Sequence, residues 1–141
     1  MRFPYHGAGI GLILNDSILV GKRSKSPFKD QWSVPGGSTE KGLDKNALET
    51  AMREFREETG VDFKTLDAKA VCSWTLKFPF FSWTTFFYTV DSFPAELKPD
   101  EFSVLCWVPL KEILQNTDKK KHFRPFSKSE VRCVIDSLSQ N

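Results

Sequence analysis

The organising segment of this sequence is Arg53-Glu54-Phe55-Arg56-Glu57-Glu58-Thr59-Gly60. Residues three and four apart share one face of a helix, so Glu54, Glu57 and Glu58 bring three carboxylates together there. Like charges at these spacings destabilise an isolated helix by about 0.2 to 0.5 kcal/mol per pair, and the helix dipole disfavours anions near the C-terminal end. Two interpretations are open at this point: a solvated acidic face, or a platform for a bound cation.

These three residues are called the glutamate face below. The helix that carries them is predicted to begin near Ala47 and to end at Gly60. Asn46 and Glu49 have the form of a capping box, because the Asn side chain can accept from a free amide of the first turn. Gly60 is typical of a C-terminal stop. Arg53 precedes Glu57 by four positions, which predicts an intrahelical ion pair. Apolar residues at three-four spacing form a stripe that is expected to face the core: Ala47, Leu48, Ala51, Met52 and Phe55.

The segments before the helix are predicted to be extended and to carry positive charge. Residues 8–14 and 18–20 indicate a strand, a tight turn and a returning strand. Arg23 and Lys25 follow this hairpin, and each is either part of a solvated loop or a phosphate contact. Pro35-Gly36-Gly37 predicts a sharp turn whose backbone can approach a ligand closely, although a plain turn has the same sequence.

The segments after the helix are predicted to be mainly strands. Residues 68–76 and 82–90 indicate two long strands, and the aromatic and β-branched run at 86–90 suits a sheet covered on both faces. Residues 91–102 are predicted to form a loop. A further strand at 104–110, the start of a short helix at 111–114 and a closing helix at 127–138 complete the pattern.

Composition limits the class of protein. The chain has 141 residues, of which 40% are hydrophobic and 27% charged, so residues 1–141 are expected to form a single globular domain. A net charge of +2 argues against dedicated nucleic-acid binding and against a membrane surface. Without an apolar run of transmembrane length or a signal peptide, the protein is expected to be soluble and cytoplasmic.

The cysteines are expected to be core residues or free thiols. Cys72, Cys106 and Cys133 are far apart in the sequence, odd in number and without C-x-x-C spacing. Such a pattern indicates neither a disulfide framework nor a zinc site, and it is typical of a reducing compartment.

Gly36-Gly37 together with residues 53–61 resembles the signature of the Nudix hydrolases, G-x5-E-x7-R-E-U-x-E-E-x-G-U, in which U is apolar. The second half matches at every specified position, with Phe55 and Val61 at the U positions. The order of hairpin, helix, two long strands, Trp107 strand and final helix is also similar to that family. The resemblance implies an α/β fold, a Nudix-type α/β/α sandwich with a mixed β-sheet.

The first half of the signature differs from this sequence. Gly37 lies sixteen residues before Arg53, where the family pattern has fourteen, so the loop is two residues longer. Counting back from Arg53 places Lys45 where the pattern has glutamate. We expect a neighbouring carboxylate to stand in, and the candidates are Asp44, Glu40 and Glu49.

The resemblance implies that the protein uses Mg²⁺, with Mn²⁺ as an alternative, to direct water at the pyrophosphate linkage of a nucleoside diphosphate joined to a group X. Carried over by position, Glu54, Glu57, Glu58 and the Gly37 carbonyl are the implied metal ligands. Arg53 is the implied catalytic residue that orients the glutamates. The general base comes from the signature or from another loop.

Other functional residues are predicted from type and place. Glu101 is the loop candidate for the general base, with its neighbour Asp100 as a substitute and an ordinary loop acid as the alternative. Aromatic residues can stack on a base, although each of them also suits the core, and basic residues can hold phosphates. The candidates for substrate binding are Arg23, Lys25, Phe28, Trp32, Phe81 and Arg124, and Phe80 and Trp83 are further aromatic candidates.

The expected ligand is a small-molecule nucleotide, and the expected assembly is a monomer or homodimer. A nucleoside triphosphate pyrophosphatase is favoured by the small size of the chain. A nucleotide-sugar hydrolase of the GDP-mannose or ADP-ribose type is the alternative within the enzyme class. A non-catalytic nucleotide-binding regulator is the alternative outside it, although the intact glutamate face argues against that alternative.

Overall fold

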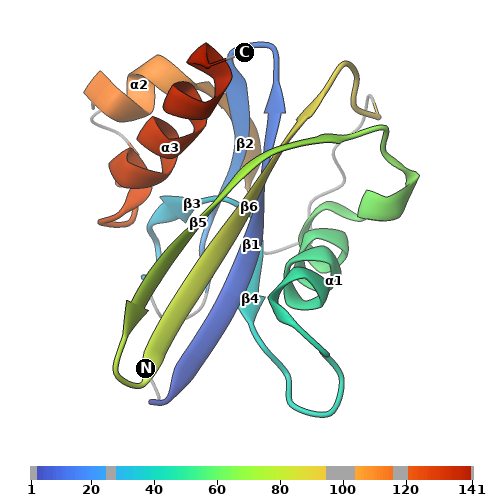
Figure 1. The fold of residues 1–141 in the computed structure, drawn as a ribbon, viewed down its shortest axis with the longest axis vertical. Helices are drawn as coiled ribbons and strands as arrows, with labels where there is room; N and C mark the ends of the chain where they lie inside the picture. The colour runs from blue at the N-terminus through green and yellow to red at the C-terminus, as the bar shows by residue number, and fades with distance from the viewer. Residues whose placement is uncertain (1–2, 25–27, 95–103, 116–120, 141) are drawn as a thin grey trace.

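A computed structural model of the chain (Figure 1) describes residues 3–24, 28–94, 104–115 and 121–140. The helices in these residues are α1 (Ala47–Thr59), α2 (Leu110–Gln115) and α3 (Ser127–Ser139), with a short 3-10 turn at Phe63–Thr65. The strands are β1 (Tyr5–Leu14), β2 (Ser17–Lys22), β3 (Trp32–Ser33), β4 (Gly36–Ser38), β5 (Lys69–Phe78), β6 (Phe81–Val90) and β7 (Leu105–Pro109).

The strands form one mixed sheet with the order β3-β2-β1-β6-β5. Strand β1 runs parallel to β6 along its whole length, from Tyr5 opposite Phe81 to Leu14 opposite Val90, and the other pairs are antiparallel. On its other edge, β1 pairs with β2 only at its C-terminal end and with β4 only near Gly7 to Gly9. The end of β2 and the start of β4 therefore lie at the same place along β1, where the strand on this edge changes from β2 to β4.

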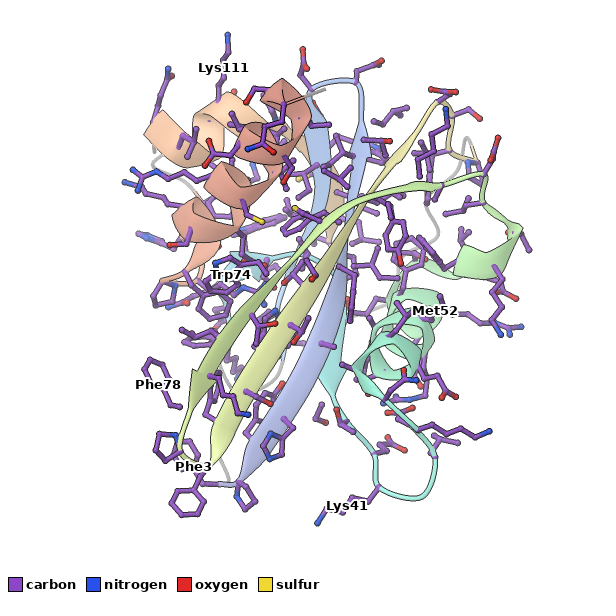
Figure 2. The ribbon with its side chains drawn as sticks, in the orientation of Figure 1. Phe3, Lys41, Met52, Trp74, Phe78 and Lys111 are labelled. Atoms are coloured by element: carbon purple, nitrogen blue, oxygen red, sulfur yellow. The ribbon has the colours of Figure 1, made fainter. Side chains whose placement is uncertain are left out.

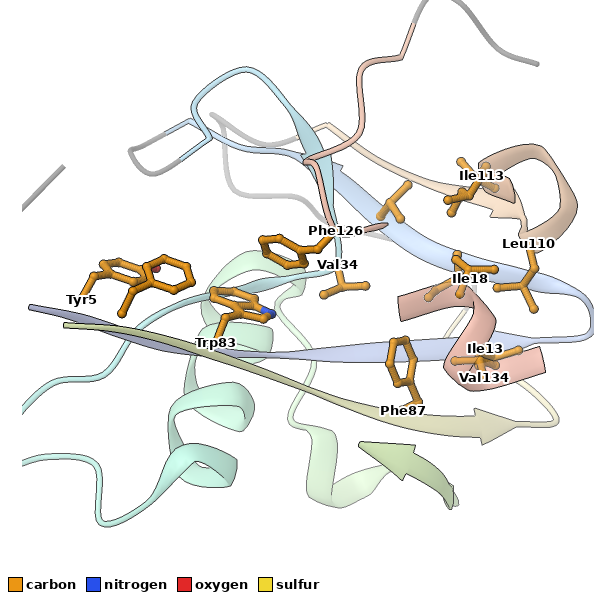
Figure 3. Close-up of a cluster of buried hydrophobic side chains, with 14 residues drawn as sticks. Tyr5, Ile13, Ile18, Val34, Trp83, Phe87, Leu110, Ile113, Phe126 and Val134 are labelled. Carbon is orange, nitrogen blue, oxygen red and sulfur yellow. The ribbon is translucent and has the colours of Figure 1, made fainter. Parts of the chain in front are cut away.

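Helices cover both faces of this sheet, which confirms the α/β/α sandwich (Figure 1). Helix α1 packs on one face, where Phe55 joins Ile10 and Leu12 in a buried cluster. Helices α2 and α3 pack on the other face, where Val134 joins Trp83 and Phe87 in the cluster drawn in Figure 3. Within the described residues, no helix is long and apolar enough to cross a membrane.

Helix α1 begins and ends where its sequence predicts. The Asn46 side chain accepts a hydrogen bond of 2.9 Å from the backbone N–H of Glu49. At the other end, Gly60 adopts the left-handed conformation with φ of 77°, and its N–H bonds to the carbonyl of Arg56. These caps hold the last turn, which carries the glutamate face, at the edge of β4.

The predicted sharp turn at Pro35-Gly36-Gly37 is present only as a bend at Pro35. Gly36 and Gly37 are extended residues of β4, and the positive φ angles among the described glycines are at Gly42 and Gly60. Glycine is needed at Gly36 because a Cβ there would lie 2.5 Å from the Ala8 carbonyl oxygen. Close packing of β4 on β1, and not backbone reversal, explains the residue.

Candidate active site

A cavity of about 250 Å³ opens beside the C-terminal half of α1. Its acidic residues come from α1 and the loop after β4, and its basic residues come from the end of β2. The charged residues that line it are Glu40, Glu54, Glu57, Glu58, Lys22 and Arg23. The fold therefore brings the glutamate face and Arg23 together, as the sequence predicts for residues that handle one charged ligand.

Arg53 connects the glutamate face to the loop before α1. Its Nη1 atom lies 3.2 Å from Glu54 and 3.3 Å from Glu57, so the predicted intrahelical ion pair with Glu57 is present. Its Nη2 atom donates a 2.9 Å bond to the Ser38 carbonyl. Nε and Nη2 donate to the two oxygens of Asp44 at 3.0 and 2.8 Å. The guanidinium thus orients two carboxylates while the loop fixes its far edge.

Asp44 makes the closest contact with Arg53 among the carboxylates near the divergent half of the signature. Its side chain is only 3% exposed, and it also accepts from the Thr50 hydroxyl and the Glu40 backbone N–H. The bidentate bond from Arg53 is the main cause that lowers the pKa of Asp44 to about 2. Glu40 is farther, at 3.7 Å from Arg53, and lines the cavity instead.

Replacing Asp44 with asparagine is expected to lower the free energy of unfolding by about 2 kcal/mol at pH 7. The folded pKa of Asp44, about 2, lies below its ordinary value of 3.8, so its contribution is complete above the ordinary value and is lost as pH falls through about 2. Urea unfolding should show the gap between wild type and variant narrowing by about half at pH 3. The exposed acid Asp67 supplies the control variant Asp67→Asn, and a gap that does not change with pH would contradict the assignment.

Burial raises the pKa of two members of the glutamate face. Burial, followed by the charge of Glu54, raises the pKa of Glu58 to about 8, although Arg23 and a hydrogen bond from the Gly36 backbone oppose the shift. Burial, followed by the charge of Glu57, also raises the pKa of Glu54. Burial therefore disfavours the ionised form of these two side chains, like charge within the glutamate face adds to the effect, and a bound cation would relieve both.

Gly37 lies against the glutamate face. A Cβ at this position would lie 2.4 Å from the carboxyl carbon of Glu54. A side chain here would displace the Glu54 carboxylate from its present position, so the Gly37 backbone and the Glu54 oxygens border the same part of the cavity.

The three carboxylates do not converge on one point in this conformation. Glu54 and Glu57 contact Arg53, whereas Glu58 accepts from Gly36. Across the described parts of the chain, no group of three or more His, Cys, Asp or Glu side chains is gathered tightly enough to hold a metal ion as it stands. An ion held by all three carboxylates would require their side chains to adopt other rotamers.

Arg23 contributes to the cavity from the end of β2. Its guanidinium carbon lies 5.7 Å from the centre of the Trp83 ring, and its charge lowers the pKa of Glu58 and of Tyr5. Tyr5 also lines the cavity, and its buried hydroxyl lies close to Arg23, whose charge and hydrogen bonding lower the pKa of Tyr5. Burial is the larger effect and raises this pKa, so the hydroxyl stays neutral.

Four of the predicted substrate-binding residues do not line this cavity. Phe81 is buried and stacks on the Tyr5 ring, so it belongs to the core. The proposed phosphate contact by Arg124 does not hold, because its guanidinium is fully buried and paired with Glu130. Phe28 packs edge-on against Phe126, and Trp32 lies beneath Lys121.

The remaining candidates fall outside the residues that the structure describes. These are Lys25, the predicted general base Glu101 and its neighbour Asp100. Their assignments stay predictions.

Sequence reasoning missed several residues that line the cavity. Lys22 directly precedes the predicted phosphate contact Arg23 but has no predicted role, and Tyr5 and Leu105 belong to no motif of the sequence. The pairing of β4 with β1 near Gly7 carries the start of β1, with Tyr5, to the cavity, and the pairing of β7 with β2 places Leu105 opposite Gly21. A long-range pairing of this kind leaves no local signal in the sequence.

Comparisons with known proteins point to one family. The family model described as "NUDIX domain" matches residues 4–129. The "ADPR responsive transcriptional repressor NtrR" of Acinetobacter baylyi is 30% identical over 102 residues, which cover 70% of this chain and 40% of the repressor. The chain therefore spans about two fifths of the length of that relative.

Solved structures share the fold. A "bifunctional NMN adenylyltransferase/ADP ribose pyrophosphatase" from Francisella tularensis, complexed with AMP and a manganese ion, has a TM-score of 0.68 and 21% identity, covering 96% of this chain and 41% of that one. An Ap4A hydrolase from C. elegans has a TM-score of 0.74 and 18% identity, covering 96% and 99% of the two chains. At these identities the likeness establishes the fold alone.

Proposed function

Because this chain belongs to the NUDIX domain family, we propose that it is a metal-dependent hydrolase that cleaves the pyrophosphate linkage of a nucleoside diphosphate joined to a group X. The observation that carries the proposal is the charge layout of the cavity. Carboxylates of the glutamate face and basic groups of Lys22 and Arg23 line one space. A pyrophosphate needs both, since a cation held by carboxylates and fixed basic side chains each offset part of its negative charge.

The residues of the cavity fit a divalent cation. Glu54, Glu57 and Glu58, with the Gly37 carbonyl, offer only oxygen ligands, which suit Mg²⁺ and Mn²⁺. Two observations support this fit: burial raises the pKa of Glu54 and Glu58, and a Cβ on Gly37 would fill the space beside Glu54. When bound, the ion supplies charge neutralisation and a more acidic water. The manganese ion named for the Francisella structure agrees with this choice of ion.

The residues of the chain then have separate tasks. Arg53 orients Glu54 and Glu57, and Asp44 and the Ser38 carbonyl hold its far edge. Arg23 and Lys22 receive phosphate oxygens of the substrate. Glu101 remains our candidate for the base that takes the proton from the attacking water.

Two substrate classes follow from different observations. The nucleoside triphosphate predicted from the sequence is the first candidate, because its phosphate chain suits a cavity lined by both carboxylates and basic side chains. The names of the repressor and of the Francisella protein both contain ADP-ribose, which makes ADP-ribose the second candidate. Both molecules contain a pyrophosphate beside a nucleoside, so the same carboxylates and basic residues serve either one.

A substrate panel tests the proposal. The protein is incubated with Mg²⁺ and with nucleoside triphosphates, ADP-ribose, GDP-mannose or dinucleoside polyphosphates, and the nucleotide products are separated by anion-exchange chromatography. We expect turnover of at least one compound, loss of turnover with EDTA and recovery with added Mg²⁺ or Mn²⁺. Turnover that persists in EDTA would contradict the metal-dependent mechanism.

The same panel separates an enzyme from a regulator. The NtrR relative is named as a repressor that responds to ADPR, so a binding role is the competing proposal. Calorimetry with each compound provides the second readout. Tight binding of one compound without turnover of any would replace the enzyme proposal by the regulatory one.

A further inference from the structure

Two cysteines that are far apart in the sequence meet between β5 and α3. The Sγ atoms of Cys72 and Cys133 lie 3.1 Å apart, although the two residues are 61 positions apart in the chain. Both are free and partly exposed. A disulfide requires an S–S distance of about 2.05 Å, so the two sulfurs need to approach by only about 1 Å.

The backbone of β5 directs Cys72 toward α3. The register of β5 against β6 shifts between Ala70 and Cys72, which is the signature of a bulge. Val71 and Cys72 consequently both pack against the core cluster on the α3 side of the sheet, together with Trp74. Figure 2 shows Trp74 on the side of β5 that α3 covers, and its ring stacks on Phe126 at 5.2 Å.

Cys133 lies on the side of α3 that meets this strand. Its neighbours Val131 and Val134 are buried in the same cluster, which fixes the rotation of the helix. The Cys133 thiol also lies 3.7 Å from the carbonyl of Ser73 on β5. These contacts therefore fix the position of α3 relative to β5 around the sulfur pair.

The sulfur pair is separate from the candidate active site. Neither cysteine lines the cavity that holds the glutamate face. The third cysteine, Cys106, lies on β7, which pairs with β2 and not with β5. Its similar partial exposure makes it a matched control for thiol chemistry at the surface of the same protein.

We propose that Cys72 and Cys133 form an oxidation site that closes to an intramolecular disulfide when the protein meets a peroxide. One thiol attacks a peroxide oxygen, which breaks the O–O bond and gives a sulfenic acid and one water. The second sulfur then attacks the sulfenic sulfur, and the hydroxyl leaves with the remaining thiol proton as a second water. The two thiols are oxidised by two electrons in total, and the peroxide is reduced.

Cys72 is expected to react first. Burial, and then the neighbouring Cys72, raises the pKa of the Cys133 thiol to about 12. Cys133 thus stays protonated near neutral pH, and because the thiolate is the form that attacks a peroxide, the first attack is assigned to Cys72. Cys133 acts as the resolving thiol, and it loses its proton as the bond forms.

The bond would connect two distant parts of the chain. Closing a loop of this length removes conformational freedom from the unfolded chain. It would also fix α3 on β5, and α3 carries Glu130, the partner of the buried Arg124. Oxidation would therefore stabilise the face of the sheet opposite α1 without adding a contact in the cavity.

Peptide mapping of the full chain tests this proposal. Purified reduced protein is treated with hydrogen peroxide, remaining thiols are alkylated, and the protein is digested with trypsin without reductant. Before alkylation, the mass of the intact oxidised protein should be lower than that of the reduced protein by two hydrogen atoms. After digestion, we expect residues 70–77 to be recovered cross-linked to residues 133–141. Cys106 should remain alkylated. Disulfide-linked dimers or cross-links through Cys106 in place of this peptide pair would overturn the proposal.

Thermal unfolding supplies the second readout. The oxidised protein should unfold at a temperature on the order of 10 °C higher than the reduced protein, and dithiothreitol should reverse the shift. Cys72→Ser and Cys133→Ser should abolish the shift, whereas Cys106→Ser should retain it. If either of the first two variants fails to fold, the cross-linked peptide of the wild type still decides the outcome. Equal unfolding temperatures of the mapped oxidised and reduced forms would contradict the predicted stabilisation.

Discussion

Replacing Glu57 with glutamine is expected to lower kcat on the best substrate by on the order of 10³-fold, with little effect on folding. The substitution keeps the size of the side chain and removes one negative charge from the glutamate face. The Glu57 side chain is 57% exposed, and it forms an ion pair with Arg53. An exposed pair of this kind contributes about 0 to 1 kcal/mol, so the loss should be catalytic and not structural.

Steady-state kinetics and urea unfolding measured on the same preparations check this expectation. The matched control is Glu49→Gln, which removes the same charge from the first turn of the same helix, away from the cavity. The control should keep wild-type kcat within about twofold, since surface charges at this distance are screened by salt. An unchanged kcat in Glu57→Gln would show that the metal assignment is wrong.

Replacing Arg124 with methionine is expected to lower the free energy of unfolding by about 3 to 5 kcal/mol. Nη2 of Arg124 donates to both carboxylate oxygens of Glu130 at 2.8 Å, and its guanidinium carbon lies 4.3 Å from the ring centres of both Trp83 and Phe126. Both partners are buried, so the variant leaves the Glu130 carboxylate without its counter-charge in the core. Figure 3 shows the Trp83 and Phe126 rings in this part of the core.

A double variant distinguishes a lost charge partner from lost packing. Arg124→Met combined with Glu130→Leu removes both charges, and we expect it to recover at least half of the stability lost in the single variant. Thr85 then loses its carboxylate acceptor but keeps the Trp83 indole N–H as a donor at 2.7 Å. Urea unfolding of the single and double variants gives the comparison. A loss in the single variant below about 1 kcal/mol would contradict the buried-pair account.

The parts of the fold that the sequence predicts well depend on local chemistry. Asn46 and Gly60 predict the bounds of α1 because each cap acts within one turn of the helix. The strand run at Phe86 and Phe87 predicts a sheet covered on both faces, and these two side chains do pack on opposite faces. The glutamate face follows from helical spacing alone.

The parts that sequence reasoning misjudged depend on contacts between distant segments. Arg124 looks like a basic loop residue until α3 supplies Glu130 and β6 supplies Trp83. Phe81 looks like a stacking platform until the parallel pairing of β1 and β6 places Tyr5 against it.

Close approach of backbones explains two further differences. The sequence around Gly36 is typical of a turn, but the pairing of β4 with β1 keeps this residue extended. The loop before α1 is longer than in the signature, but Arg53 still has a carboxylate partner in this loop, because Asp44 accepts a hydrogen bond from its guanidinium. The spacing of residues in the sequence predicts neither the extended Gly36 nor the Asp44 contact, since each depends on which segment of the chain lies next to the residue.

Binding of Mn²⁺, measured by the loss of the free-ion electron paramagnetic resonance signal during titration, tests the central claim most directly. The account predicts that wild type and Glu49→Gln bind Mn²⁺ equally and that Glu57→Gln binds it at least about tenfold more weakly. The measurement needs no substrate, so it does not depend on the identity of X. Equal Mn²⁺ affinity in Glu57→Gln and wild type would contradict the claim that the glutamate face of α1 is the metal site.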